Sequence, residues 1–133
     1  MERNKAINLT FFESQDMYRR LIEAVHVGIF ISDESGRLLY VNHAFVKILG
    51  YDSKDQVIGN SIGSLLFPSE RVLDSFFQSM SRLGFIEDFE CQKTRVGGGE
   101  MTLSVTGNFI YDDYNHKIGI EGVVHNLTDV KAL

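Results

Sequence analysis

The chain of 133 residues has one cysteine, one proline, no tryptophan and no long apolar run. Because Cys91 has no second cysteine to pair with, an internal disulfide is excluded, and so is a structural zinc site built on several thiolates. No apolar stretch approaches the ~20 residues of a membrane-spanning helix, and residues 1–15 lack the apolar region of a signal peptide. We therefore expect a cytoplasmic protein without a membrane segment in this sequence.

Positive charge is also scarce and scattered. Lysine and arginine number 13 against 18 aspartates and glutamates, which gives a net charge of −5. Nucleic-acid binding requires clustered basic residues, and the densest pair here, Arg19 and Arg20, fits a solvated helix face better. We expect no nucleic-acid partner. The length and the 44% apolar content instead predict one globular domain with its own core.

The first half of the chain predicts a helix, a hairpin and a second, short helix. Residues 10–13 have the spacing of a capping box, and Met17, Leu21 and Val25 form an apolar stripe. Residues 28–32 and 37–41 predict two strands joined by a turn at 33–36. Asn42 is a favoured N-cap and Gly50 a favoured helix end. The inward residues of this short helix are Phe45, Ile48 and Leu49.

The second half predicts a long helix and three strands. Short helical pieces span 51–67, and Pro68 suits the first turn of a helix that ends at Gly84. Its apolar stripe comprises Val72, Leu73, Phe76, Phe77, Met80 and Leu83. The strands are predicted at 85–95, 100–111 and 118–127, with Phe85, Phe89 and Cys91 on one face of the first. Strands at both ends of the chain and helices between them indicate an α+β fold with an antiparallel sheet.

The order and spacing of these features resemble a PAS domain. The residues that carry the resemblance are Gly28-Ile29-Phe30-Ile31, Asp33, Gly36, Val41-Asn42, Phe45, Gly50-Tyr51, Gly59 and Asn126-Leu127-Thr128-Asp129. The resemblance implies a five-stranded antiparallel sheet in strand order 2-1-5-4-3, helices on one face and an N-terminal flanking helix. It divides the chain into a flanking segment at 1–16, the domain at 17–129 and the start of a signalling linker at 130–133.

In the family, signals leave through the flanking helices, often across a dimer. The resemblance therefore implies a signalling role for Asn126, Thr128 and Asp129. This sequence departs from the family at Asn126, where an aspartate that pairs with a basic residue is usual. Family members belong to histidine kinases, cyclic-dinucleotide enzymes or transcriptional regulators, so we expect a sensory domain of a larger bacterial signalling protein, without catalytic activity of its own.

Two cofactors known in the family are disfavoured. The flavin-adduct subfamily places its reactive cysteine on a middle helix, whereas Cys91 falls on a strand and is better explained as a small core residue. Haem-binding members place an axial histidine on the long helix, which has none. The four histidines, His26, His43, His116 and His125, fit surface or cap positions, and the identity of any cofactor stays open.

An enzyme reaction is not indicated. The sequence has no GxSxG motif, no paired carboxylates in an acid–base setting and no Cys/His constellation. The run Gly97-Gly98-Gly99 lies between two strands, where a hairpin turn is expected, and not between a strand and a helix N-terminus, where a phosphate loop belongs.

Two interpretations of the apolar interior remain. It either encloses a pocket for an uncharged or largely apolar small molecule, or is filled by its own side chains. The candidate lining residues are Phe45, Ile48, Leu73, Phe76, Phe77, Phe89, Cys91, Leu103, Val105 and Val124. The alternative function is a ligand-free interaction module, in which the apolar segment 7–12 pairs with its copy in a homodimer or covers the open sheet face.

Overall fold

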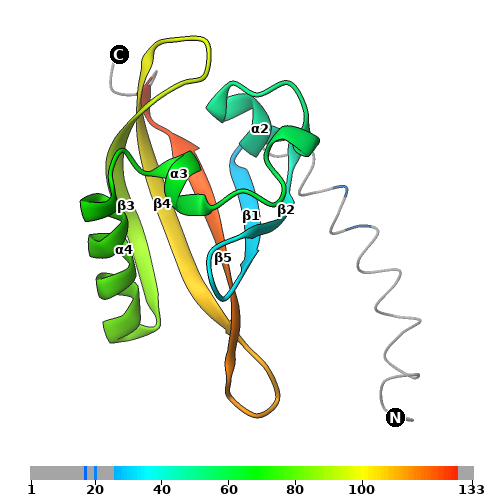
Figure 1. The fold of residues 1–133 in the computed structure, drawn as a ribbon, viewed down its shortest axis with the longest axis vertical. Helices are drawn as coiled ribbons and strands as arrows, with labels where there is room; N and C mark the ends of the chain where they lie inside the picture. Colours follow the sequence, from blue (N-terminus) through cyan, green and yellow to red (C-terminus); the bar gives the residue numbers. More distant parts are fainter. Residues whose placement is uncertain (1–16, 18–19, 21–25, 129–133) are drawn as a thin grey trace.

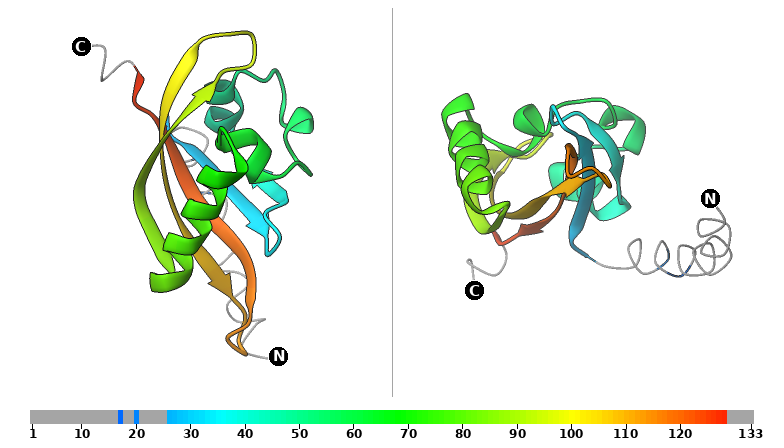
Figure 2. Two further views of the ribbon diagram at one scale, coloured as in Figure 1. Left: turned by 60° about the vertical axis from the view of Figure 1, so that its left-hand side comes forward. Right: turned by 90° about the horizontal axis from the view of Figure 1, so that it is seen from below.

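A computed structural model describes Met17, Arg20 and residues 26–128 of the chain. Within these residues, five antiparallel strands form one sheet and the helices pack across one of its faces (Figures 1 and 2). Apart from Met17 and Arg20, the predicted N-terminal helix lies outside the described residues, as do the segments 1–16 and 130–133. No helix of the described part is long and apolar enough to cross a membrane.

The strand order is that of the prediction, β2-β1-β5-β4-β3. The strands run over Gly28–Asp33 (β1), Leu38–Val41 (β2), Phe85–Thr94 (β3), Glu100–Tyr111 (β4) and Lys117–Asn126 (β5). The first hairpin joins the last three strands because β1 pairs with β5, with Phe30 opposite Gly122. The α+β prediction and the antiparallel sheet are therefore confirmed.

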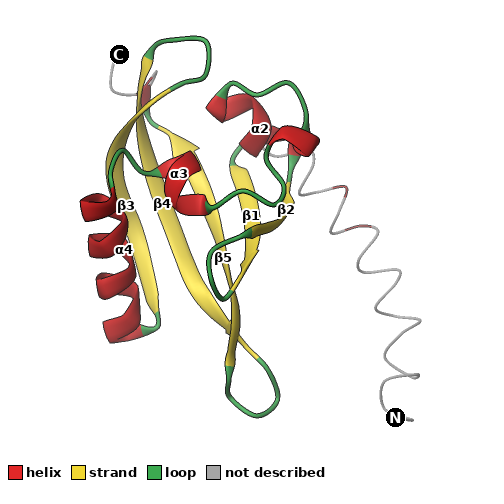
Figure 3. Ribbon diagram, viewed as in Figure 1, coloured by secondary structure: helices red, strands yellow, loops and turns green. Residues whose placement is uncertain are grey.

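In the sequence, the helical segments come after the first two strands and before the last three; in space, they pack across one face of the single sheet (Figure 3). They are α2 (His43–Leu49), the 3₁₀ turn η1 (Lys54–Gln56), α3 (Ile62–Leu66) and α4 (Glu70–Leu83). Both predicted ends of α2 are confirmed. The Asn42 Oδ1 atom accepts a hydrogen bond from the Phe45 amide, and Gly50 takes a φ of +90° at the C-cap.

The start and the end of α4 differ from the prediction. Pro68 is not in its first turn, because Ser69 is the N-cap and its hydroxyl accepts a hydrogen bond from the Val72 amide at 3.3 Å. Leu83 belongs to the predicted apolar stripe but is 71% exposed. It is the last residue of the helix, and the chain turns into β3 at Gly84, so no further helical turn covers its side chain.

The predicted alternation of β3 is wrong at Phe85. Ile86 pairs with Gly107 and Phe89 with Val105, so β3 carries one residue more than β4 between these pairs. Such a bulge inverts the alternation of side chains. Ile86 therefore packs against the core, whereas Phe85 is 46% exposed on the other face. Asp88, within the bulge, has a φ of +51°.

Candidate functional site

The ten predicted lining residues all belong to, or pack against, one hydrophobic core between the sheet and the helices. The buried ones are Phe45, Phe76, Cys91, Leu103, Val105 and Val124; the partly buried ones are Ile48, Leu73, Phe77 and Phe89. The structure thus brings together side chains from two helices and three strands. Whether they bind a ligand stays a prediction.

Three phenylalanine rings fill the interior between α4 and β3. The Phe76 ring centroid lies 4.9 Å from that of Phe67 and 5.4 Å from that of Phe89, and the Phe67 and Phe89 centroids are 6.0 Å apart. These are the distances of tilted and edge-to-face aromatic packing. We call Phe67, Phe76 and Phe89 the aromatic cluster. In this conformation its rings occupy the space next to α4.

Sequence reasoning missed Phe67, which is only 2% exposed. It lies between α3 and α4 in extended backbone, where neither helical nor strand periodicity applies. The available signal was the apolar run Leu65-Leu66-Phe67 directly before the proline. Outside Phe67 the surface has a hollow of about 410 Å³, whose lining includes Phe67, Leu73 and Lys93.

Cys91 is a buried core residue, as predicted from its strand position. Its thiol donates a hydrogen bond to the Leu66 carbonyl, with an Sγ–O distance of 3.4 Å. Burial raises the pKa of Cys91 to about 11, against a smaller opposing effect of the Lys93 charge. The thiol is therefore protonated at neutral pH and is a poor nucleophile.

Lys93 lies one alternation further along the same face of β3. Its ammonium group donates to the Ser64 carbonyl at 2.8 Å and to the Phe67 carbonyl at 3.1 Å. A helix leaves its last carbonyls without intrahelical partners. Here, side chains of β3 supply these partners and tie the end of α3 to the sheet.

The opposite face of the sheet carries no helix within the described residues (Figure 2). Ile29, Ile31, Tyr40 and Val123 are half-buried there and line a hollow of about 260 Å³. Its polar rim includes Glu121, whose carboxylate accepts a hydrogen bond from Asn108 at 3.0 Å. We call this the outer face.

Leu127 and Thr128 follow β5, and we call them the exit segment; three hydrogen bonds hold it in place. The Thr128 amide donates to Asn126 Oδ1 at 3.0 Å. Thr128 Oγ1 in turn accepts from the Thr102 amide at 3.0 Å, and the Leu127 amide donates to the Thr102 carbonyl at 2.8 Å. An uncharged Asn126 is thus sufficient to hold this turn. Asp129 lies outside the described residues.

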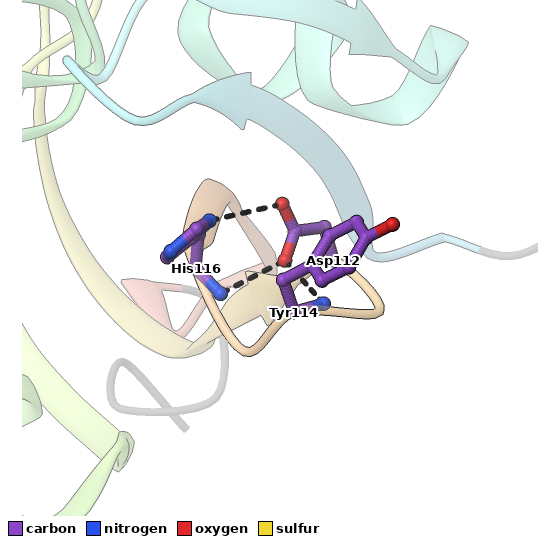
Figure 4. Close-up of polar contacts among 3 residues, drawn as sticks. All are labelled: Asp112, Tyr114 and His116. Carbon is purple, nitrogen blue, oxygen red and sulfur yellow. Dashed lines mark hydrogen bonds and ion pairs between the residues drawn. The ribbon is translucent and has the colours of Figure 1, made fainter.

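The histidines are not gathered into a site. His26, His43 and His125 are exposed, and the His116 side chain is 77% exposed in the β4–β5 hairpin (Figure 4). Asp112 organises that hairpin by accepting hydrogen bonds from the amides of Tyr114 and His116. In the part of the chain that the structure describes, no three His, Cys, Asp or Glu side chains are placed to hold a metal ion.

The side chains that would form a flavin adduct or ligate a haem iron are also not at the positions that the family resemblance predicts for them. The long helix α4 contains no histidine, and the one thiol lies on β3 with a raised pKa.

Comparison with known proteins gives one family. A model described as the PAS fold matches residues 16–127. The curated proteins yield no significant match.

Several solved PAS domains match over most of their length. The PAS domain of a protein from Colwellia psychrerythraea has a TM-score of 0.77 and 20% identity, covering 86% of this chain and 98% of that one. A PAS domain of a LuxR-family transcriptional regulator from Burkholderia thailandensis, in complex with ethanol, has a TM-score of 0.67 and 21% identity, covering 83% and 96%.

A third structure is a domain of a sensory box sensor histidine kinase/response regulator from Geobacter sulfurreducens. It has a TM-score of 0.64 and 23% identity, covering 86% of this chain and 96% of that chain. At these identities the likeness concerns the fold alone.

Proposed function

The chain belongs to the PAS family, and from this we propose that residues 17–129 are a sensory domain of a larger, bacterial and cytoplasmic signalling protein. The domain binds a small molecule or a partner and transmits its state through the flanking segments 1–16 and 130–133. PAS domains are regulatory modules, so catalysis belongs to an output domain. We infer a histidine kinase or a cyclic-dinucleotide cyclase or phosphodiesterase as the parent protein.

The observation that carries the proposal is the double role of β4. Leu103 and Val105 face the interior, whereas Thr102, the neighbour of Leu103, holds the exit segment through its amide and carbonyl. Because packed interiors transmit displacement, a ligand that shifts Leu103 also shifts Thr102 and the chain leaving through Thr128.

The interior chemistry favours an uncharged ligand. The aromatic cluster and its aliphatic neighbours offer apolar contacts, and the nearby Lys93 ammonium already donates to two carbonyls. A charged molecule would lose its hydration without a partner. The ethanol described for the Burkholderia thailandensis domain is an uncharged small molecule of this class, and the Geobacter sulfurreducens domain comes from a sensor histidine kinase.

Native mass spectrometry of the freshly purified chain tests the proposal. An extra mass that disappears on denaturation would be a copurified ligand, and its value would begin to identify it. The same spectrum gives the oligomeric state. A bare mass, together with no binding from a library of small uncharged molecules, would count against a ligand sensor.

The outer face favours a second candidate, a ligand-free dimerisation or interaction module. Half-exposed Ile29, Ile31, Tyr40 and Val123 form an apolar surface on the helix-free side of the sheet. We propose that the apolar segment 7–12 either covers this face or pairs with its copy in a homodimer. Deleting residues 1–15 distinguishes the two: loss of the dimer with an intact fold supports the interface, and loss of the fold supports the cover.

A further inference from the structure

The connection between α3 and α4 is held to the sheet by side chains. Three carbonyls at the end of α3 accept hydrogen bonds from β3: Leu66 from the Cys91 thiol, and Ser64 and Phe67 from the Lys93 ammonium. A thiol is a weak donor, so the two Lys93 bonds are the stronger of these hydrogen bonds. Lys93 is half-buried beside the surface hollow, within reach of solvent.

Of the three rings in the aromatic cluster, only that of Phe67 belongs to the connection between α3 and α4. Phe76 belongs to α4 and Phe89 to β3, both within regular elements, whereas Phe67 is in extended backbone between two helices. Phe67 lies between the protein interior and the surface hollow of about 410 Å³. A movement of the connection alone would therefore remove one ring from the cluster and join the hollow to the interior.

We propose that the α3–α4 connection is the entrance of the interior ligand site, that Lys93 is its latch, and that Phe67 occupies the place of an aromatic ring of the ligand. The inference rests on the proposed sensory function and deepens it. The vacated place is bounded by the edges and faces of Phe76 and Phe89, which receive another ring in the same tilted or edge-to-face geometry. The ligand class is thus a small, uncharged aromatic molecule.

Indole is a suitable probe, because the chain contains no tryptophan whose fluorescence would interfere. Its binding to the full 133-residue chain can be followed by its own emission and by stopped-flow mixing. Two changes separate the two parts of the proposal. Phe67→Ala, with the milder Phe67→Leu in case the first does not fold, tests the place of the ring. Lys93→Met, which keeps the length of the side chain but removes its donors, tests the latch.

The expected results are specific. Phe67→Ala binds indole at least about tenfold more tightly than the unaltered chain, because an apolar cavity of ring size accepts such molecules. Lys93→Met leaves the cluster unchanged and raises the association rate of indole several-fold. The matched controls are Phe85→Ala, which removes a half-exposed ring at the start of β3, and Lys47→Met, which removes an exposed charge on α2. Both should behave as the unaltered chain.

Two results would overturn the proposal. Indole affinity that responds to neither change at Phe67 would overturn the place assigned to the ligand ring. An association rate for Lys93→Met equal to that of Lys47→Met would overturn the latch and the entrance. Native mass spectrometry distinguishes failure of this inference from failure of the proposed sensory function. A copurified ligand in a protein that fails both indole tests would leave the sensory function standing and place its entrance elsewhere.

Discussion

The amide of Thr102 donates a hydrogen bond to Thr128 Oγ1 across 3.0 Å, and so attaches the last described residue of the chain to the strand that lines the interior. Thr102 also reaches the other neighbouring strand, because its hydroxyl and the Gln92 carboxamide exchange hydrogen bonds of 3.0 and 3.2 Å. One residue of β4 thus connects the exit segment, the interior strand and β3.

Replacing Thr128 by valine should loosen the exit segment while the fold persists. Valine keeps the shape of threonine but removes the acceptor, at a cost of about 1 kcal/mol for the lost bond. Amide hydrogen exchange should become faster at Thr102 and Leu127. Thr128→Ser keeps the hydroxyl and should retain protection. Equal exchange in both variants would contradict a role for the hydroxyl.

Asn42 should be among the most sensitive polar positions. It is fully buried, and its Oδ1 accepts from the amides of Ile29 (2.8 Å) and Phe45 (3.0 Å), while its Nδ2 donates to the Val27 carbonyl. Asn42→Ala loses the helix cap and leaves buried groups unpaired, so we expect about 2–4 kcal/mol of lost stability in urea unfolding.

The control for that change is Asn60→Ala. Asn60 is exposed and donates one side-chain hydrogen bond, to the Gln56 carbonyl. Its loss should cost under about 1 kcal/mol. Similar losses of stability at both positions would argue that the buried network around Asn42 is not what makes it important.

The bulge in β3 predicts unequal losses of stability for two neighbours. Ile86→Ala removes a side chain that packs against the core and should cost about 1–2 kcal/mol, less than a fully buried isoleucine would. Phe85→Ala removes a larger but half-exposed ring and should cost under about 1 kcal/mol. Thermal unfolding of both variants measures the two losses of stability. The reverse order would mean that β3 alternates regularly, as its sequence suggests.

Asp33 should contribute to the pH dependence of stability. Its carboxylate accepts from the Ser35 hydroxyl at 2.7 Å and from the amides of Ser35 and Arg37 at 2.9 Å. The Ser35 hydroxyl, followed by the Arg37 amide, lowers the pKa of Asp33 below its ordinary value of 3.8. The stability from the ionised form is therefore fully present above pH 3.8 and is lost as the pH falls through the lower, folded-state pKa.

Urea unfolding of Asp33→Asn at several pH values measures this contribution. The unaltered chain should exceed the variant in stability near neutral pH, and the difference should shrink below pH 3.8, because asparagine does not ionise. A difference that stays constant across this range would show that the carboxylate charge plays no part in the turn.

Cys91 should resist thiol reagents in the folded chain. A pKa of about 11 in place of 9.0 means about 100-fold less thiolate at neutral pH, and burial limits access further. A disulfide reagent such as Ellman's reagent should therefore label the native chain much more slowly than the urea-unfolded chain. Rapid labelling of native protein would mean that the α3–α4 connection opens readily, and would place Cys91 within reach of solvent.

Much of the fold could be predicted because its signals are local. The turn at Asp33 and Gly36, the cap at Asn42 and the stop at Gly50 each depend on residues within a few positions of one another, and the structure confirms all of them. The burial of Cys91 followed from strand alternation in the same way. The strand order came from the resemblance to a family and was equally correct.

The tertiary structure decided what depends on residues far apart in the sequence. A single extra residue in β3 exchanged Ile86 for Phe85 in the core, since alternation carries no mark of where a bulge interrupts it. Phe67 joined the aromatic cluster from a connection without periodicity. The attachment of α3 by Lys93 spans 29 positions to Ser64 and has no sequence signature. A lysine on a strand is expected to be solvent-exposed, and only the folded structure places the end of a helix beside it, whose carbonyls accept its hydrogen bonds.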